Sequence, residues 1–241
     1  MYGYGYGYYG FDWTYILLII GMLLSLAASA RLKSTFSCYR RIRSASGLTG
    51  AETAKRILQA AGITDVHVRA ISGSLTDHYD PRTKTVSLSE DIYGQTSLAA
   101  VGVAAHECGH AIQHAIGYAP LEFRSAIVPV ANFGSTLSWP LFLIGLFSGI
   151  RPLVTAGIVL FSLAVLFQLV TLPVEINASS RALKMLQSTG ILGTDETRGA
   201  RKVLTAAAMT YVAALAASIL QLLQQFSLNS LVTHLPFMTA E

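Results

Sequence analysis

Charged residues are scarce in this chain, and the shortage narrows its class. Asp, Glu, Lys and Arg make up 12% of the 241 residues, whereas an ordinary soluble domain carries about 25%. Hydrophobic residues make up 52% and gather in a few long stretches. So little charge cannot cover that much apolar surface. The composition therefore excludes an ordinary soluble domain and predicts a membrane protein.

Cysteine is also scarce, with only Cys38 and Cys108 in the whole chain. Two cysteines make no disulfide framework, which excludes a small disulfide-stabilised secreted domain. Cys108 lies two residues after His106 on an expected helix and therefore on another helical face. We expect Cys108 to be a small packed side chain.

Acidic residues are outnumbered by basic ones, 13 to 17, which gives a net charge of +4. An excess of positive charge can indicate nucleic-acid binding. Here the basic residues cluster beside the apolar stretches, as they do on the cytoplasmic side of membrane proteins. We therefore expect the lipid bilayer, and no nucleic acid, as a partner.

Four apolar stretches are long enough to cross a bilayer, so the fold class is a mainly α-helical, multi-pass membrane protein. No basic residue precedes the first stretch, and Arg31 and Lys33 follow it, which indicates an uncleaved anchor with its N-terminus outside. The expected segments are a Tyr/Gly-rich tail (1–10), a first span (11–30), a folded segment (31–126), a helical hairpin of two spans (127–172), a second segment (173–202), a fourth span (203–225) and a C-terminal tail (226–241).

The basic residues also indicate a side of the membrane. Residues 31–126 hold eleven of the 17 and residues 173–202 hold five, and four spans place both segments on the same side. Only Arg151 is left on the other side. The positive-inside rule assigns the basic side to the cytoplasm of a cell membrane.

Residues 31–126 carry the signals of a small α+β unit. A capping-box pattern at 49–52 predicts a helix over 51–61. Alternating apolar residues predict a strand at 66–70, and residues 85–89 predict a second strand, whose edge we expect to pair with an extended substrate. A long helix is expected to begin at Thr96 or Ser97 and to end near Ile116.

This long helix carries the strongest functional pattern, His-Glu-Cys-Gly-His at 106–110. Two histidines four residues apart lie one turn apart on one helical face, so His106 and His110 can bind a single metal ion. Glu107 lies beside them as a candidate general base. The pattern predicts a catalytic site with one Zn²⁺ ion, and the alternative is a pair of packed histidines near a glutamate.

A zinc peptidase needs a third protein ligand. His114 continues the series, but eight residues of helix rise roughly 12 Å, too far for one ion that also binds His110. Glu175 is the better candidate, since a carboxylate beside an apolar span is costly without a partner and the span count returns it to the histidines' side. Capping of a following helix, or pairing with Arg181, is its alternative role.

In the implied mechanism, zinc lowers the pKa of its bound water toward about 7. Glu107 takes the proton during attack on a peptide carbonyl and delivers it to the leaving amine. A second electrophile usually helps, and Arg181, His114 and Tyr211 are open candidates. Asn177 and Ser179 are candidates for orienting the ligands.

Three stretches carry a family resemblance, LTDHYDPR at 75–82, SLAAVGVAAHECGHAIQ at 97–113 and LPVE at 172–175. Together they resemble the YugP-like neutral zinc metallopeptidases of bacterial membranes. The resemblance extends over about residues 12–225 and implies one zinc site at His106, His110 and Glu175 in a multi-pass protein. Heat-shock and prenyl-processing membrane peptidases are similar more distantly. They have an aspartate where this chain has Ser179, which leaves the supporting role of that position open.

Together these patterns predict a zincin-like cytoplasmic unit and a membrane-embedded zinc metalloendopeptidase that hydrolyses peptide bonds in peptides or membrane proteins. The alternative is a non-catalytic, zinc-containing membrane scaffold. Glu107 favours the enzyme, because a purely structural site needs no base. A transporter is weaker still, since Asn132 and Gln168 are the only strongly polar side chains well inside the spans. Substrate and oligomeric state stay open.

Overall fold

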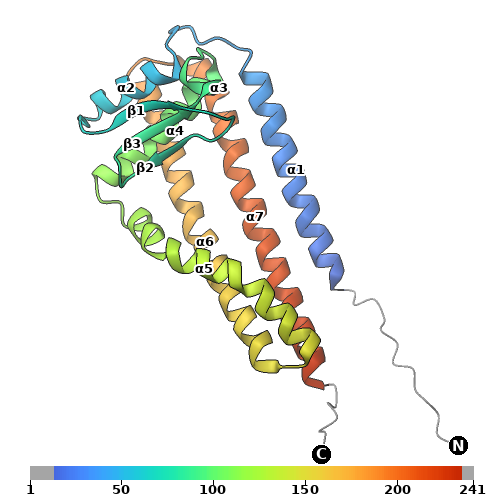
Figure 1. Ribbon diagram of the computed structural model, residues 1–241. Coiled ribbons are helices and arrows are strands. Elements are labelled where there is room, and N and C mark those ends of the chain that lie inside the picture. The colour runs from blue at the N-terminus through green and yellow to red at the C-terminus, as the bar shows by residue number, and fades with distance from the viewer. Residues whose placement is uncertain (1–13, 235–241) are drawn as a thin grey trace, which may run out of the picture. The chain divides into compact units, whose positions relative to one another are not determined.

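The computed structural model describes residues 14–234, with side chains up to residue 230 (Figure 1). The Tyr/Gly-rich tail expected at 1–10 and the end of the C-terminal tail lie outside the described residues. The elements, in chain order, are α1 (Tyr15–Tyr39), α2 (Gly50–Ala60), β1 (His67–Ile71), β2 (His78–Asp80), β3 (Thr85–Ser89), α3 (Glu90–Tyr93), α4 (Leu98–Ala115), α5 (Ala119–Ser148), α6 (Arg151–Ser188) and α7 (Thr194–His234).

Four helices among the described residues are long and apolar enough to cross a membrane, as the composition predicts. They are α1, α5, α6 and the Thr194–Ser230 part of α7. Each is longer than the apolar stretch in the sequence. Most notably, α6 continues through Pro173 to Ser188, so the residues after the expected boundary at 172 are helical. Glu175 consequently lies inside a helix and does not cap a new one.

The chain divides into two compact units. Unit 1 contains the described residues of 1–26, 130–165 and 213–241, and unit 2 contains residues 27–129 and 166–212. The residues predicted for the metal site all belong to unit 2.

In unit 1, glycines allow α5 and α6 to pack closely. A Cβ atom on Gly157 would lie 2.8 Å from the backbone nitrogen of Phe142, and one on Gly145 would lie 2.8 Å from a methyl of Val154. Phe142, Val154 and Ile158 form a small buried apolar cluster at this contact. These three side chains and the two glycines therefore hold the α5–α6 hairpin together.

Unit 2 contains a three-stranded mixed sheet with the order β1-β3-β2. β3 is parallel to β1, with His67 opposite Thr85, and antiparallel to β2, with Asp80 opposite Thr85. All of β3 is buried, and both of its edges are paired. The prediction that residues 85–89 offer an edge to substrate is therefore wrong. The outer strands are β1 and β2, an order that the periodicity of a single strand cannot reveal.

Helices α2 and α4 pack on each other and on this sheet (Figure 1). Thr49 and Glu52 form the predicted capping box at the start of α2, with each side chain accepting a hydrogen bond from the other residue's backbone N–H. Ser97 caps α4 by accepting a hydrogen bond from the Ala100 N–H. Both helix starts and the bounds of β3 confirm the sequence-based expectations. The apolar core lies between α2, α4 and the sheet, with Ile57 and Leu88 fully buried in it.

Candidate metal centre

The first half of α4 carries small, apolar, buried side chains, and it leads directly to the histidines that are predicted to bind the metal. Ala99, Ala100 and Ala104 are fully buried, so the helix packs tightly against its neighbours. Tight packing fixes the rotation of α4 and thereby the direction of His106 and His110. Their rings lie edge to face with centroids 4.8 Å apart, in the arrangement expected from their spacing of one turn.

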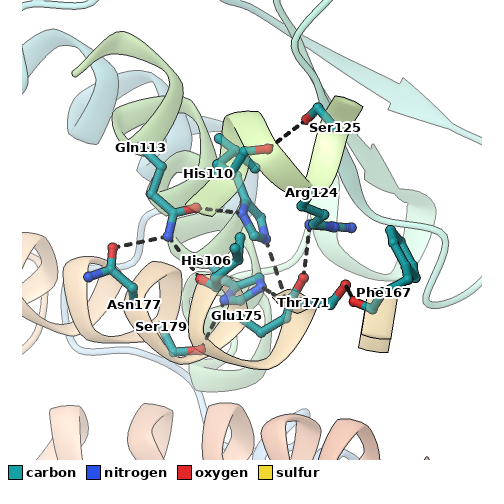
Figure 2. Close-up of polar contacts among 12 residues, drawn as sticks. His106, His110, Gln113, Arg124, Ser125, Phe167, Thr171, Glu175, Asn177 and Ser179 are labelled. Atoms are coloured by element: carbon teal, nitrogen blue, oxygen red, sulfur yellow. Dashed lines mark hydrogen bonds and ion pairs between the residues drawn. The ribbon is translucent and has the colours of Figure 1, made fainter. Parts of the chain in front are cut away.

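Glu175 of α6 lies against both histidines (Figure 2). Its Oε2 atom is 3.2 Å from Nε2 of His106 and 3.6 Å from Nε2 of His110. The Glu175 side chain is only 4% exposed. The predicted third ligand and the two predicted histidines therefore present three donor atoms to one point, within 4.8 Å of one another.

The spacing of these donors fits a zinc ion. Zinc binds imidazole nitrogen and carboxylate oxygen at about 2.0–2.2 Å, which separates two donors on a tetrahedron by roughly 3.3 Å. The two separations between Glu175 and the histidines, 3.2 and 3.6 Å, lie close to that value, and all three donor atoms lie within 4.8 Å of one another. Two neutral imidazoles and one carboxylate are also the donor set of a zinc site that keeps a fourth position open.

Gly109 allows α4 and α6 to come close enough for this arrangement. A Cβ atom at this position would overlap the backbone carbonyl oxygen of Ala178 and would lie 3.0 Å from its carbonyl carbon. The obstacle is backbone, which cannot swing aside as the end of a flexible side chain can. The glycine between the two histidines is therefore the reason that Glu175 and Ser179 can lie beside them.

Gln113 determines which nitrogen of His110 faces the cluster. Its side-chain amide donates to the Val174 carbonyl oxygen at 2.8 Å and to Oδ1 of Asn177 at 3.0 Å. Both of its N–H groups are then used, so its Oε1 atom accepts from Nδ1 of His110 at 3.0 Å. The proton of neutral His110 is held on Nδ1, and the lone pair of Nε2 faces the space between the three donors. This is the support that metal-binding histidines usually receive.

Arg181 maintains the orientation of this network from its outer end. Its Nε–H donates to Oδ1 of Asn177 at 2.7 Å. An arginine can only donate, so it keeps the Asn177 oxygen facing inward, where that oxygen also accepts from Gln113. The guanidinium lies 5.8 Å from the ring centre of Tyr118. Arg181 thus contacts Asn177, and not Glu175 as its alternative pairing would require.

Two further side chains contact the clustered donors. The Ser179 hydroxyl is 3.1 Å from Nδ1 of His106, so the position left open by the distant resemblance does contact one of the predicted ligands. Arg124 of α5 donates to Oε1 of Glu175 at 3.3 Å and leaves Oε2 for the histidines. The sequence patterns identify neither Gln113 nor Arg124 as a supporting residue. Gln113 lies three residues after His110 on the same helical face, which is a signal for contact with it, whereas no local pattern links Arg124 to Glu175.

The protonation of His110 follows from these contacts. Burial disfavours the imidazolium form, but the adjoining Glu175 carboxylate outweighs burial and raises the pKa of His110 above its ordinary value. A metal ion and a proton compete for the same nitrogen. Metal affinity is therefore expected to decline as the pH falls through this raised pKa.

Of the other residues considered from the sequence, His114 and Cys108 lie apart from the three donors, and Tyr211 lies beside them. Nδ1 of His114 is 2.8 Å from the Tyr79 hydroxyl, and His114 is not among the clustered donors. The Cys108 thiol is fully buried and faces the Ala54 carbonyl oxygen of α2, and burial raises its thiol pKa. Tyr211, in contrast, lines the same two cavities as Glu175.

Glu107 also lines both cavities beside the donor cluster. The residue is only 7% exposed. Among the described residues, no hydrogen bond or ion pair engages its carboxylate. A buried carboxylate beside these three donors, open to a cavity, is in a position to exchange a proton with a molecule bound there.

The fold and this cluster define a protein with four helices able to span a membrane and a site made of two histidines and one glutamate. The chain belongs to the family described as "Putative neutral zinc metallopeptidase", whose family model matches residues 14–230. It is similar to the "Putative membrane protease YugP" of Bacillus subtilis (strain 168), with 49% identity over 211 residues that cover 87% of this chain and 94% of that protein. No solved structure matches the chain.

Replacing Gln113 tests the proposed support of His110. We expect Gln113→Leu to weaken Zn²⁺ binding on the order of 10- to 100-fold, because the histidine loses its acceptor. Gln113→Glu keeps an acceptor for Nδ1 but sets its second oxygen against the Val174 carbonyl and Oδ1 of Asn177, so it should also bind zinc less tightly than wild type. Competition with a chromophoric chelator on the detergent-purified chain measures both affinities. Equal affinity of Gln113→Leu and wild type would contradict the role, and Gln59→Leu on the exposed face of α2 is the control.

Gly109→Ala tests the close approach of α4 and α6. Overpacking of this kind costs about 1–3 kcal/mol, and the expected result is a lower unfolding temperature together with weaker zinc binding. Gly94→Ala is the matched control, because a Cβ atom there would meet nothing within 4 Å. If both variants bound zinc as the wild type does, the contact would not control the site.

Proposed function

We propose that the protein is a membrane-embedded zinc metalloendopeptidase. The observation that carries the proposal is the convergence of His106, His110 and Glu175 on one point, with Glu107 at the same cavities. The family and the relative support the same reading, since one is described as a zinc metallopeptidase and the other as a membrane protease. Substrates would be peptides or membrane proteins.

The three clustered side chains would hold a single Zn²⁺ ion. When bound there, zinc would lower the pKa of a coordinated water toward about 7 and polarise the carbonyl of the bond to be cleaved. His106 and His110 are kept in place by Ser179 and Gln113, respectively, so their ring nitrogens do not need to reorganise. The carboxylate of Glu175 is positioned by Arg124 through its other oxygen.

Glu107 would act as the general base and then as the general acid. Its carboxylate takes a proton from the attacking water and delivers that proton to the leaving amine nitrogen. The amine leaves neutral, and the carboxylate returns to its starting charge. Tyr211 is the side chain best placed to donate a hydrogen bond to the developing oxyanion, because it lines both cavities with Glu107.

The outer strand β2 is the best candidate for binding an extended substrate. Its residues His78, Tyr79 and Asp80 line the same cavity as His110 and Glu107. One edge of β2 is paired with β3, and its other edge is at the border of the sheet. Strand addition at that edge would supply backbone hydrogen bonds without requiring a particular sequence.

Catalysis is tested by Glu107→Gln, which removes the base and preserves the shape of the side chain. We expect kcat to fall on the order of 10²- to 10⁴-fold, with zinc content unchanged. Turnover would be measured on peptide and membrane-protein substrates with purified protein, beside Glu90→Gln on the exposed surface of α3 as control. A wild type that carries zinc but is no faster than Glu107→Gln on every substrate class would favour the scaffold instead.

The cytoplasmic side of the site is proposed from the distribution of basic residues. Cysteines added one at a time to a Cys38→Ser background, in which only the buried Cys108 remains, test it. The two added cysteines are Gln59→Cys on α2 and Ser148→Cys at the end of α5, both exposed positions. An impermeant maleimide should label Ser148→Cys in intact cells and Gln59→Cys only after permeabilisation. The reverse pattern would place the site outside the cytoplasm.

A further inference from the structure

Two cavities of unit 2 meet at the metal centre. One has a volume of about 190 Å³ and the other of about 320 Å³. Both cavities are lined by Asp77, His106, Glu107, Glu175 and Tyr211. In a polypeptide cleaved at this centre, the residues on the two sides of the scissile bond would therefore face different cavities.

The two cavities differ sharply in chemistry. Helices α1, α4 and α7 line the smaller one with apolar side chains, which are Phe36, Val103, Val203, Leu204, Ala207 and Ala208. Polar and charged side chains dominate the wall of the larger one, including His78, Asp80, Arg82, Arg124 and Ser125. An apolar side chain would leave water on entering the first cavity, and a polar one would keep hydrogen-bond partners in the second.

Leu75 adds an apolar side chain to the smaller cavity at some backbone cost. Its φ angle is +57°, a region that leucine rarely adopts, and the residue is 51% exposed. The loop that carries it is fixed on both sides, by the Ser74 hydroxyl donating to Asp91 at 2.6 Å and by Asp77 accepting from the Ser89 N–H at 2.7 Å. A strained, exposed leucine on an anchored loop at the cavity wall is typical of a ligand-contacting position.

We propose that the smaller cavity is a specificity subsite, which takes an apolar side chain of the substrate residue next to the scissile bond. This inference rests on the proposed peptidase activity. A volume of about 190 Å³ is several times the roughly 30 Å³ that one water occupies, which is room for a side chain such as leucine or phenylalanine. Leu75 and the wall formed by Phe36 and Leu204 provide its contacts, and Ala207 and Ala208 provide its space.

The subsite is tested by filling it. Ala207→Phe places a large side chain in the cavity, and Thr205→Phe, on an exposed part of α7 that does not line it, is the matched control. Leu75→Asn is a second variant, because asparagine tolerates a positive φ and removes only the apolar contact. Mass spectrometry of cleaved peptides first locates the scissile bond. Pairs of peptides that differ only by leucine or serine beside that bond are then compared.

Wild type should cleave the leucine peptide with a kcat/KM on the order of 10- to 100-fold higher than the serine peptide, as a hydrophobic pocket discriminates. Ala207→Phe and Leu75→Asn should lose most of that preference and keep their zinc, whereas Thr205→Phe should keep both. Cleavage by the wild type without an apolar preference would overturn the subsite alone, as would an equal preference in Ala207→Phe and Thr205→Phe. Cleavage no faster than that of Glu107→Gln would overturn the proposed function as well.

Discussion

The close contact between α4 and α6 is the constraint on which the site depends. Gly109 meets the backbone of Ala178 with no room for a Cβ atom, which brings the two histidines of one helix against the glutamate and serine of the other. The same approach places Gln113 within reach of the Val174 carbonyl and of Asn177. A glycine in the middle of a helix costs about 0.5–1 kcal/mol relative to alanine. Here that cost allows a contact that no other residue permits.

Glu175 illustrates how the protein compensates a buried charge. A carboxylate that is 4% exposed would be strongly destabilising without partners. The Oε2 atom of Glu175 lies against the imidazoles of His106 and His110, and its Oε1 atom accepts from Arg124. Gln113 in turn holds the His110 ring. A network in which each member is satisfied specifies one geometry, whereas a partly satisfied one would be looser than an apolar core. Rigid support of this kind is what a metal site with an open position requires.

Signals that act over a few residues predicted their part of the structure well. The capping box of α2, the Ser97 cap of α4, the bounds of β3 and the pairing of His106 with His110 all depend on neighbours within about one helical turn or one strand. Glu175 was identified indirectly, through the cost of a carboxylate beside an apolar span. Features that depend on distant segments were missed or misjudged. β2 is only three residues long. β3 is central because β1 and β2 both pair with it. The contact of Arg124 depends on how α5 and α6 meet.

The central claim is that two histidines and one glutamate hold a single zinc ion with a position open for water. X-ray absorption at the zinc edge on the purified, zinc-loaded chain tests it most directly, together with the zinc content per chain. The account predicts one ion with only nitrogen and oxygen neighbours at about 2.0–2.2 Å, two of them imidazoles. A sulfur neighbour at about 2.3 Å, or an ion that keeps its imidazole neighbours when His106 and His110 are both replaced by alanine, would contradict it.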